Sequence, residues 1–169
     1  MSKKVLVLLE EMVEDSEFLY PYFRLKEEGF EVLSSAPEKK RYKGKGGMQF
    51  KPDKTFNEIR DQVFDAVVIP GGYAPDRWRR EEGIVGFVKD HFNKGKLIAS
   101  ICHGPWLLIS AGIVKGKKVT AFHAIKDDLI NAGADYQGND MEEDGNLLTS
   151  TNPKTMLPMI KRLVERLKE

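Results

Sequence analysis

Residues 97–112 read 97-LIASICHGPWLLISAG-112, and the pattern changes from strand to helix within this stretch. The first five residues are mostly apolar, which is typical of a strand buried on both faces. After Gly104 and Pro105 the apolar residues recur at helical spacing up to Gly112, a residue type at which helices end. Cys102 lies at the junction. The stretch therefore predicts a strand-to-helix elbow that lifts the side chain of Cys102 out of a sheet.

The position of Cys102 favours nucleophilic chemistry. A helix N-terminus lowers the pKa of a cysteine through its unpaired amides and aligned dipole, and the thiolate is the nucleophilic form. His103 follows directly and supplies a group that can exchange a proton with the thiol. We therefore expect Cys102 to be a nucleophile whose pKa lies below the free value of ~8.5, rather than a small buried apolar residue.

Length and charge narrow the classes of function. The chain has 169 residues, the size of one domain with a substantial core. Its 27 basic and 26 acidic residues give a net charge of +1, which does not suggest a nucleic acid partner. No apolar run has the length of a membrane span, and residues 1–4 lead into a strand rather than a signal peptide. A single cysteine cannot form an internal disulfide, so we expect a cytoplasmic protein.

Strand and helix patterns alternate along the chain. The patterns predict strands at 4–9, 30–36, 64–69, 97–101, 117–121 and 147–150, helices at 18–28, 83–93, 126–131 and 153–168, a hairpin or loop at 37–52, and a strand pair within 135–146 that turns at 144–145. No linker or internal repeat interrupts the alternation. The prediction is a single α/β domain over residues 1–169, a doubly wound, mostly parallel, flavodoxin-like sheet sandwiched by helices.

Two further segments are expected near the elbow. Several acidic residues follow the first strand, and in a parallel sheet the carboxyl ends of the strands face the ligand crevice. We interpret most of these acids as helix-start charges, with Glu17 as the exception. The strand at 64–69 ends in Pro70-Gly71-Gly72, where glycines let backbone amides approach a ligand.

With these segments in place, the chain resembles the ThiJ/PfpI family of the class I glutamine-amidotransferase-like superfamily, and within it the PfpI-type intracellular cysteine peptidases. The resemblance spans nearly the whole chain in order. The stretches that carry it are Glu17–Tyr22, Arg24–Gly29, Ile69–Gly72, Ala74–Asp76, Ala99–Pro105, Ile125–Asp128 and Asn131–Gly133.

The resemblance implies roles for individual residues. Cys102 would be the nucleophile and His103 its proton-exchange partner. Glu17 would lie against the sulfur as a protonated carboxyl, and the amides of Gly72 and His103 would form the oxyanion hole. Asp76 matches the family's third acid, usually a Glu from a neighbouring subunit that orients the histidine. It is one methylene shorter than Glu, so its reach to the histidine is reduced.

Other positions depart from the family or from the site. Phe122 stands where relatives often have Tyr, and His123 replaces the following proline. His123 is either a polar group that compensates for the lost hydroxyl or a surface or hydrogen-bonded histidine, and we favour the second interpretation. His91 is expected to be solvated or to complement a helix dipole. Trp106 is expected beside the elbow, and Trp78, in the charged segment 74–80, against another subunit.

The family resemblance leaves several functions open. The first is a hydrolase in which Cys102 attacks a peptide carbonyl. The alternative is a glyoxalase or protein deglycase in which Cys102 attacks methylglyoxal or its hemithioacetal or aminocarbinol. A third is a redox sensor or chaperone-like stress protein that uses an oxidisable thiol. We expect no cofactor and no metal, and the resemblance implies a homo-oligomer, a dimer or a hexamer built of dimers.

Overall fold

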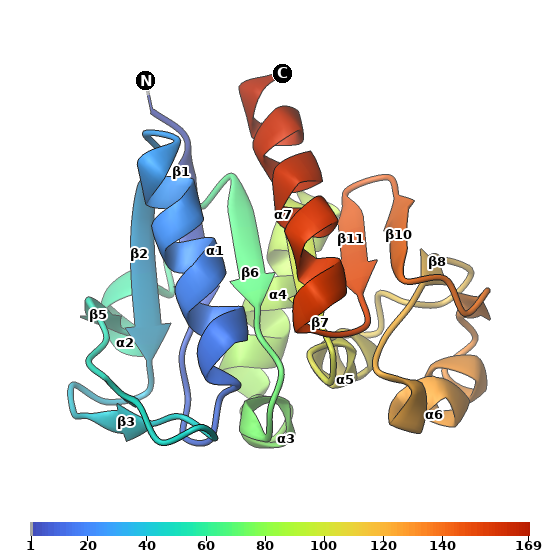
Figure 1. The fold of residues 1–169 in the computed structure, drawn as a ribbon, viewed down its shortest axis with the longest axis horizontal. Coiled ribbons are helices and arrows are strands. Elements are labelled where there is room, and N and C mark those ends of the chain that lie inside the picture. Colours follow the sequence, from blue (N-terminus) through green and yellow to red (C-terminus); the bar gives the residue numbers. More distant parts are fainter. Residues whose placement is uncertain (1) are drawn as a thin grey trace.

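A seven-stranded sheet forms the centre of the fold (Figure 1). The computed structural model describes residues 2–169, so Met1, which belongs to the segment 1–4 expected to lead into the first strand, lies outside the described residues. The strand order is β10-β11-β7-β6-β1-β2-β5, and each neighbouring pair is parallel except β10 with β11. The strands are β1 (Lys4–Leu8), β2 (Glu31–Ala36), β5 (Lys54–Thr55), β6 (Ala66–Ile69), β7 (Leu97–Ile101), β10 (Met141–Asp144) and β11 (Leu147–Ser150). The predicted mostly parallel sheet is confirmed.

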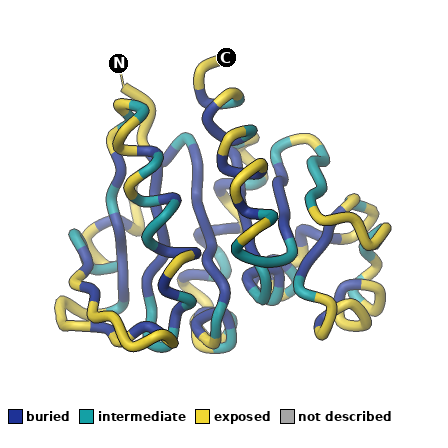
Figure 2. Tube along the Cα trace, viewed as in Figure 1, coloured by how far each residue is buried: buried dark blue, intermediate teal, exposed yellow. Residues whose placement is uncertain are grey.

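The central strands are buried because helices cover both faces of the sheet. Every residue of β6, β7 and β11 is buried, as the dark blue strands in Figure 2 show. α1 (Asp15–Glu27) and α7 (Pro153–Lys168) lie side by side on one face, and α4 (Glu82–Asn93) packs on β6 and β7 from the other (Figure 1). Parallel strands covered in this way read as continuous apolar runs, which is how the sequence predicted them.

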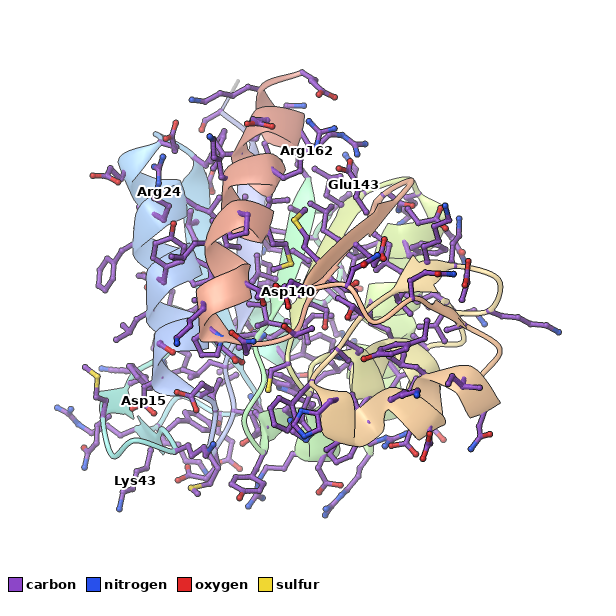
Figure 3. The ribbon with its side chains drawn as sticks, turned by 45° about the vertical axis from the view of Figure 1, so that its right-hand side comes forward. Asp15, Arg24, Lys43, Asp140, Glu143 and Arg162 are labelled. Atoms are coloured by element: carbon purple, nitrogen blue, oxygen red, sulfur yellow. The ribbon has the colours of Figure 1, made fainter. Side chains whose placement is uncertain are left out.

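The closing helix α7 has the predicted bounds. The side chain of Asn152 accepts a hydrogen bond from the Lys154 amide (2.9 Å) and caps the helix start. The five residues predicted to face inward are all buried, namely Met156, Ile160, Leu163, Val164 and Leu167. On the outer side of α7, Arg162 donates to Glu143 of β10 through Nε (2.7 Å) and Nη2 (3.2 Å) (Figure 3). No helix within residues 2–169 is long and apolar enough to cross a membrane.

Smaller elements complete the edges. The segment 37–52 is a hairpin of β3 (Tyr42–Lys43) and β4 (Gln49–Phe50), as predicted. The remaining short elements are α2 (Phe56–Ile59), α3 (Ala74–Trp78), α5 (Pro105–Ser110), β8 (Lys118–Val119), the 3-10 helix η1 (His123–Ile125), α6 (Lys126–Asn131) and β9 (Asp135–Tyr136).

One helix start and one strand pairing differ clearly from the sequence expectation, while several other boundaries shift by one to three residues. α1 begins at Asp15 rather than Phe18 and continues through Pro21. The strand pair expected within 135–146 does not form: β9 pairs in parallel with β8, and β10 forms its hairpin with β11 around Gly145. Strand partners are chosen by tertiary packing, which local turn signals do not encode.

Two side chains predicted on the surface are in the core. Trp78 is 1% exposed in α3, so it does not contact another subunit. His91 is 2% exposed in α4; its Nε2 accepts the Phe64 amide (3.1 Å), and its Nδ1 lies 2.8 Å from the Phe87 carbonyl oxygen. Burial lowers the pKa of His91, so this ring is a neutral structural group.

Candidate active site

Cys102 lies directly after β7 in a strained backbone conformation. Its φ is +59°, the left-handed region that costs a non-glycine residue about 1–2 kcal/mol. Hydrogen bonds hold this conformation from both sides: the Cys102 amide donates to the Ser150 carbonyl (2.9 Å), and the Phe122 amide donates to the Cys102 carbonyl (2.9 Å). The predicted elbow is confirmed, and strands β7 and β11 together fix the direction of the thiol.

Glycine lets the neighbouring backbones approach the elbow. A Cβ on Gly71 would lie 2.6 Å from Glu17 Oε2 and 2.8 Å from the Cβ of Cys102. A Cβ on Gly104 would lie 2.4 Å from the hydroxyl of Ser100. Contacts this short do not occur between real side chains, so both positions need glycine for the thiol, the carboxyl and the Pro-Gly-Gly turn to meet.

Glu17 is completely buried beside the elbow. It lies in the first turn of α1 with 0% of its surface exposed, and its Oε2 accepts a hydrogen bond from the Gly71 amide (2.6 Å). Its second oxygen, Oε1, has no hydrogen-bond partner within residues 2–169. Burial raises the pKa of Glu17 to about 7, while hydrogen bonds from Gly71 and Cys102 act in the opposite direction. The structure thus brings together Glu17 and Cys102, as the family pattern implied.

The pKa of the thiol differs from the sequence expectation. Burial, and then the negative charge of Glu17, raise the pKa of Cys102 to about 12. The helix effect is too weak to reverse this, because α5 has only six residues and begins three residues after Cys102. A charge on either group raises the pKa of the other, so the Glu17–Cys102 pair holds at most one negative charge at neutral pH. The expected depression of the thiol pKa is therefore wrong, and the thiolate exists when Glu17 keeps the shared proton.

Two backbone amides are directed at the sulfur. The amides of His103 and Gly72 both lower the pKa of Cys102. Gly72 has a φ of +78°, and a Cβ there would lie 2.4 Å from the Glu14 amide nitrogen and 2.5 Å from the Met12 carbonyl oxygen. The turn after β6 is held there because the Tyr73 amide donates to the same Met12 carbonyl (2.9 Å). Two donors converging on one point can stabilise an anion.

His103 contacts the thiol and two aromatic rings. Its Nδ1 lies 3.3 Å from the sulfur of Cys102. The imidazole stacks on Phe122 (centroids 5.2 Å apart) and meets Trp106 edge-on (5.1 Å), which confirms the place expected for Trp106. Burial, Lys45 and His123 all lower the pKa of His103, so the ring is neutral at pH 7. His123 is exposed and packs on Phe122 (4.3 Å), outside the cavity at Cys102.

Asp76 does not join this group within one chain. Its carboxylate is 47% exposed and forms an ion pair with Arg80 on the next turn. Among residues 2–169, no carboxylate forms a hydrogen bond or ion pair with His103. One chain thus assembles Cys102, His103, Glu17 and Gly72 and leaves out Asp76.

A cavity of about 380 Å³ opens onto Cys102, and some of its lining was not anticipated. Lys45, Tyr73 and Asn152 line it together with Glu17, Cys102, His103, Phe122 and Trp106. Lys45 comes from the hairpin and lies between Gly44 and Gly46 in the sequence. The two glycines were the sequence signal that could have pointed to Lys45, because glycines on both sides of a cation are typical of a loop that approaches another part of the chain closely.

Comparison with known proteins identifies this arrangement. The model of the DJ-1/PfpI family matches residues 3–166. The chain belongs to the DJ-1/PfpI family. A relative from Pyrococcus horikoshii, named a deglycase, is 44% identical over 165 residues, which cover 98% of this chain and 99% of the relative. A Bacillus subtilis relative, whose name assigns it provisionally to the cysteine proteases, is 38% identical over 154 residues. These residues cover 90% of this chain and 91% of the relative.

The solved structures agree with this assignment. Drosophila melanogaster DJ-1beta superposes with a TM-score of 0.94 at 29% identity and is matched over 99% of this chain and 91% of its own. The family resemblance carried by the elbow, the Pro-Gly-Gly turn and the early carboxylate is therefore confirmed.

Proposed function

We propose that this DJ-1/PfpI protein is a cysteine-dependent deglycase that removes methylglyoxal adducts from thiols and amines and releases lactate, without a cofactor. The observation that carries the proposal is the pairing of buried Glu17 with half-buried Cys102 at a cavity of about 380 Å³. A cavity of this size fits a three-carbon adduct and part of its carrier better than an extended peptide. The name of the Pyrococcus horikoshii relative supports the same activity.

The proposed reaction needs no external oxidant. The thiolate of Cys102 bonds to C1 of the adduct, and the carrier leaves from C1 with a proton as a free thiol or amine. In the resulting Cys102 hemithioacetal the C1 carbon-bound proton moves to C2, and the C1 hydroxyl proton moves to the C2 oxygen. C1 is thereby oxidised to a thioester and C2 is reduced to an alcohol. Water then cleaves the lactoyl thioester and restores the thiol.

Each step of the proposed reaction depends on particular residues at the site. Glu17 holds the shared proton while Cys102 attacks and so keeps the thiolate available. His103, neutral and 3.3 Å from the sulfur, is the group proposed to carry the proton from C1 to C2. The amides of Gly72 and His103 would donate to the oxygen on C1 as negative charge develops.

A peptidase is the second candidate, which the name of the Bacillus subtilis relative favours. Amide hydrolysis requires His103 to protonate an amine leaving group, and a carboxylate normally orients such a histidine. We propose that Asp76 of a second copy supplies this carboxylate in a homodimer, and that hexamers are built of such dimers. The half-exposed position of Asp76 supports a role at an interface.

One paired assay tests both candidates. Lactate is measured after addition of methylglyoxal, and free thiol is measured after addition of its hemithioacetal with N-acetylcysteine. Cleavage of a fluorogenic peptide is followed in parallel, with Cys102→Ser as the control throughout. Lactate and thiol release that depend on Cys102 are expected; peptide cleavage without lactate would overturn the deglycase proposal in favour of the peptidase. A reactive thiol suits a reducing compartment, so we place the reaction in the cytoplasm.

A further inference from the structure

The hairpin between β3 and β4 is fastened to the start of α1 through Asp15. The carboxylate of Asp15 is 8% exposed and accepts hydrogen bonds from the amides of Gly46 (2.5 Å) and Met48 (3.0 Å). Figure 3 shows Asp15 at the end of α1 next to the hairpin. A buried carboxylate that accepts two amides is a strong local anchor, because breaking these bonds would leave a charge unsatisfied.

The glycines of the hairpin make this attachment possible. A Cβ on Gly44 would lie 2.5 Å from Asp15 Oδ1, and a Cβ on Gly46 would lie 3.0 Å from Oδ2. Between them, the amide of Lys45 donates to the Val13 carbonyl (2.8 Å). Three amides of the hairpin, those of Lys45, Gly46 and Met48, are therefore bonded to the start of α1 and the residues before it, and the hairpin presents Lys45 in a defined position.

The side chain of Lys45 lines the cavity that opens onto Cys102. Its ammonium lies 3.5 Å from Glu14 and 5.9 Å from the centre of the Tyr73 ring, and the side chain is 49% exposed. An ammonium has three N–H donors, so the Glu14 contact leaves donors for a ligand. The positive charge also lowers the pKa of Glu17, Cys102 and His103, which places it within electrostatic range of all three groups.

We propose that Lys45 is a specificity-determining residue that binds a carboxylate on the carrier half of the substrate and so selects anionic adducts for attack by Cys102. As a statement about substrate, this inference rests on the proposed deglycase function. The carrier must extend from C1 toward the cavity mouth, where Lys45 lies at the rim with unused donors. Thiols and amines whose own carboxylate is near the reacting atom, such as free amino acids and short peptides, have this geometry.

The first test measures anion binding at Cys102 without using catalysis. Iodoacetate and iodoacetamide alkylate the same thiol but differ in charge, and Cys102 is the only cysteine in the chain, so the mass change has one origin. We expect Lys45→Met to lower the iodoacetate-to-iodoacetamide rate ratio about fivefold, which is within the range that a partly exposed ion pair supplies. Lys45→Arg keeps the charge and should keep the ratio.

Lys43→Met is the matched control. Lys43 belongs to the same hairpin, is exposed, and does not line the cavity; Figure 3 shows its side chain directed away from the rest of the fold. The Lys43→Met substitution removes the same charge as Lys45→Met and should leave the iodoacetate-to-iodoacetamide rate ratio unchanged. An unchanged ratio in Lys45→Met, or an equal fall in Lys43→Met, would overturn the proposal, because the effect would then be absent or would reflect net charge alone.

The second test uses the proposed reaction. The wild type should prefer the methylglyoxal adduct of N-acetylcysteine over that of N-acetylcysteine amide, mainly through KM, and Lys45→Met should lose about fivefold of this preference. If both adducts are turned over without discrimination, the specificity role is refuted while the deglycase function stands. If neither is turned over, the deglycase function is refuted, and the alkylation ratio still decides whether Lys45 binds an anion beside Cys102.

Discussion

Replacing Glu17 by Gln should change the pH dependence of Cys102 reactivity in a characteristic way. In the wild type the pair loses its first proton near pH 7, because burial raises the pKa of Glu17 to about 7. The second proton stays until near pH 12, because burial and the Glu17 charge raise the pKa of Cys102 to about 12. Between these values one proton is shared, and the thiolate fraction does not depend on pH.

In Glu17→Gln only the thiol titrates. The amide carries no charge, so burial remains the main cause that holds the pKa of Cys102 above its ordinary value of 9.0. Below that pKa, the thiolate fraction grows tenfold per pH unit, so alkylation should accelerate about 100-fold from pH 7 to pH 9. In the wild type the same interval spans only the upper half of the first titration, and we expect about a twofold increase.

The assay is alkylation by iodoacetamide, a neutral reagent, followed by intact mass. Glu14→Gln is the matched control: it removes a carboxylate from the same cavity, one that raises the pKa of Glu17 without sharing its proton. This control should keep a flat profile above a slightly lower midpoint. A wild-type rate that climbs tenfold per pH unit from 7 to 9 would show that Cys102 titrates independently of Glu17 and would refute the shared-proton account.

Three further predictions follow from the site. The pKa of Glu17 rises from 4.5 to about 7 on folding, so the stability that this group contributes below pH 4.5 is lost as the pH rises through 7. Between pH 4 and pH 8 the free energy of unfolding of the wild type should therefore fall by about 3 kcal/mol relative to that of Glu17→Gln, as measured by urea denaturation. Gly71→Ala should abolish lactate formation and lower stability by about 1–3 kcal/mol, because the new Cβ would lie 2.6 Å from Glu17, whereas Gly86→Ala in α4, with open space around its Cβ, should retain both. Cys102→Ala and Asp76→Asn should each have low peptidase activity and regain it when mixed, provided that mass spectrometry shows subunit exchange; exchange without recovery would exclude Asp76 as the partner's contribution.

The sequence determined the features that depend on neighbours along the chain. The apolar runs that became β1, β6 and β7 are nearly continuous because both faces of those strands are covered, and this pattern can be recognised in the local sequence. The helical spacing of apolar residues in α7 likewise marks its inward face. Cys102 and His103 are adjacent, so the elbow and the histidine near the thiol follow from the strand-to-helix change alone. Glu17 and Gly72 were placed by family resemblance, which carries tertiary information that their local sequence lacks.

Only the tertiary structure decided the electrostatics and the outer lining of the site. The pKa of the Cys102 thiol was expected to fall and instead rises, because the thiol is desolvated. Desolvation depends on how segments that are distant in sequence pack together, such as those of Glu17 and Gly71, which lie 54 residues apart and are hydrogen-bonded. Lys45 reaches the cavity because the amides of Gly46 and Met48 in its hairpin bond to Asp15, which lies 31 and 33 positions earlier in the chain. Trp78 and His91 are core residues because distant segments of the chain pack around them. Burial is a property of the folded chain. The local sequence around a polar residue does not show which distant residues will exclude water from it, or which donors and acceptors will satisfy its hydrogen bonds.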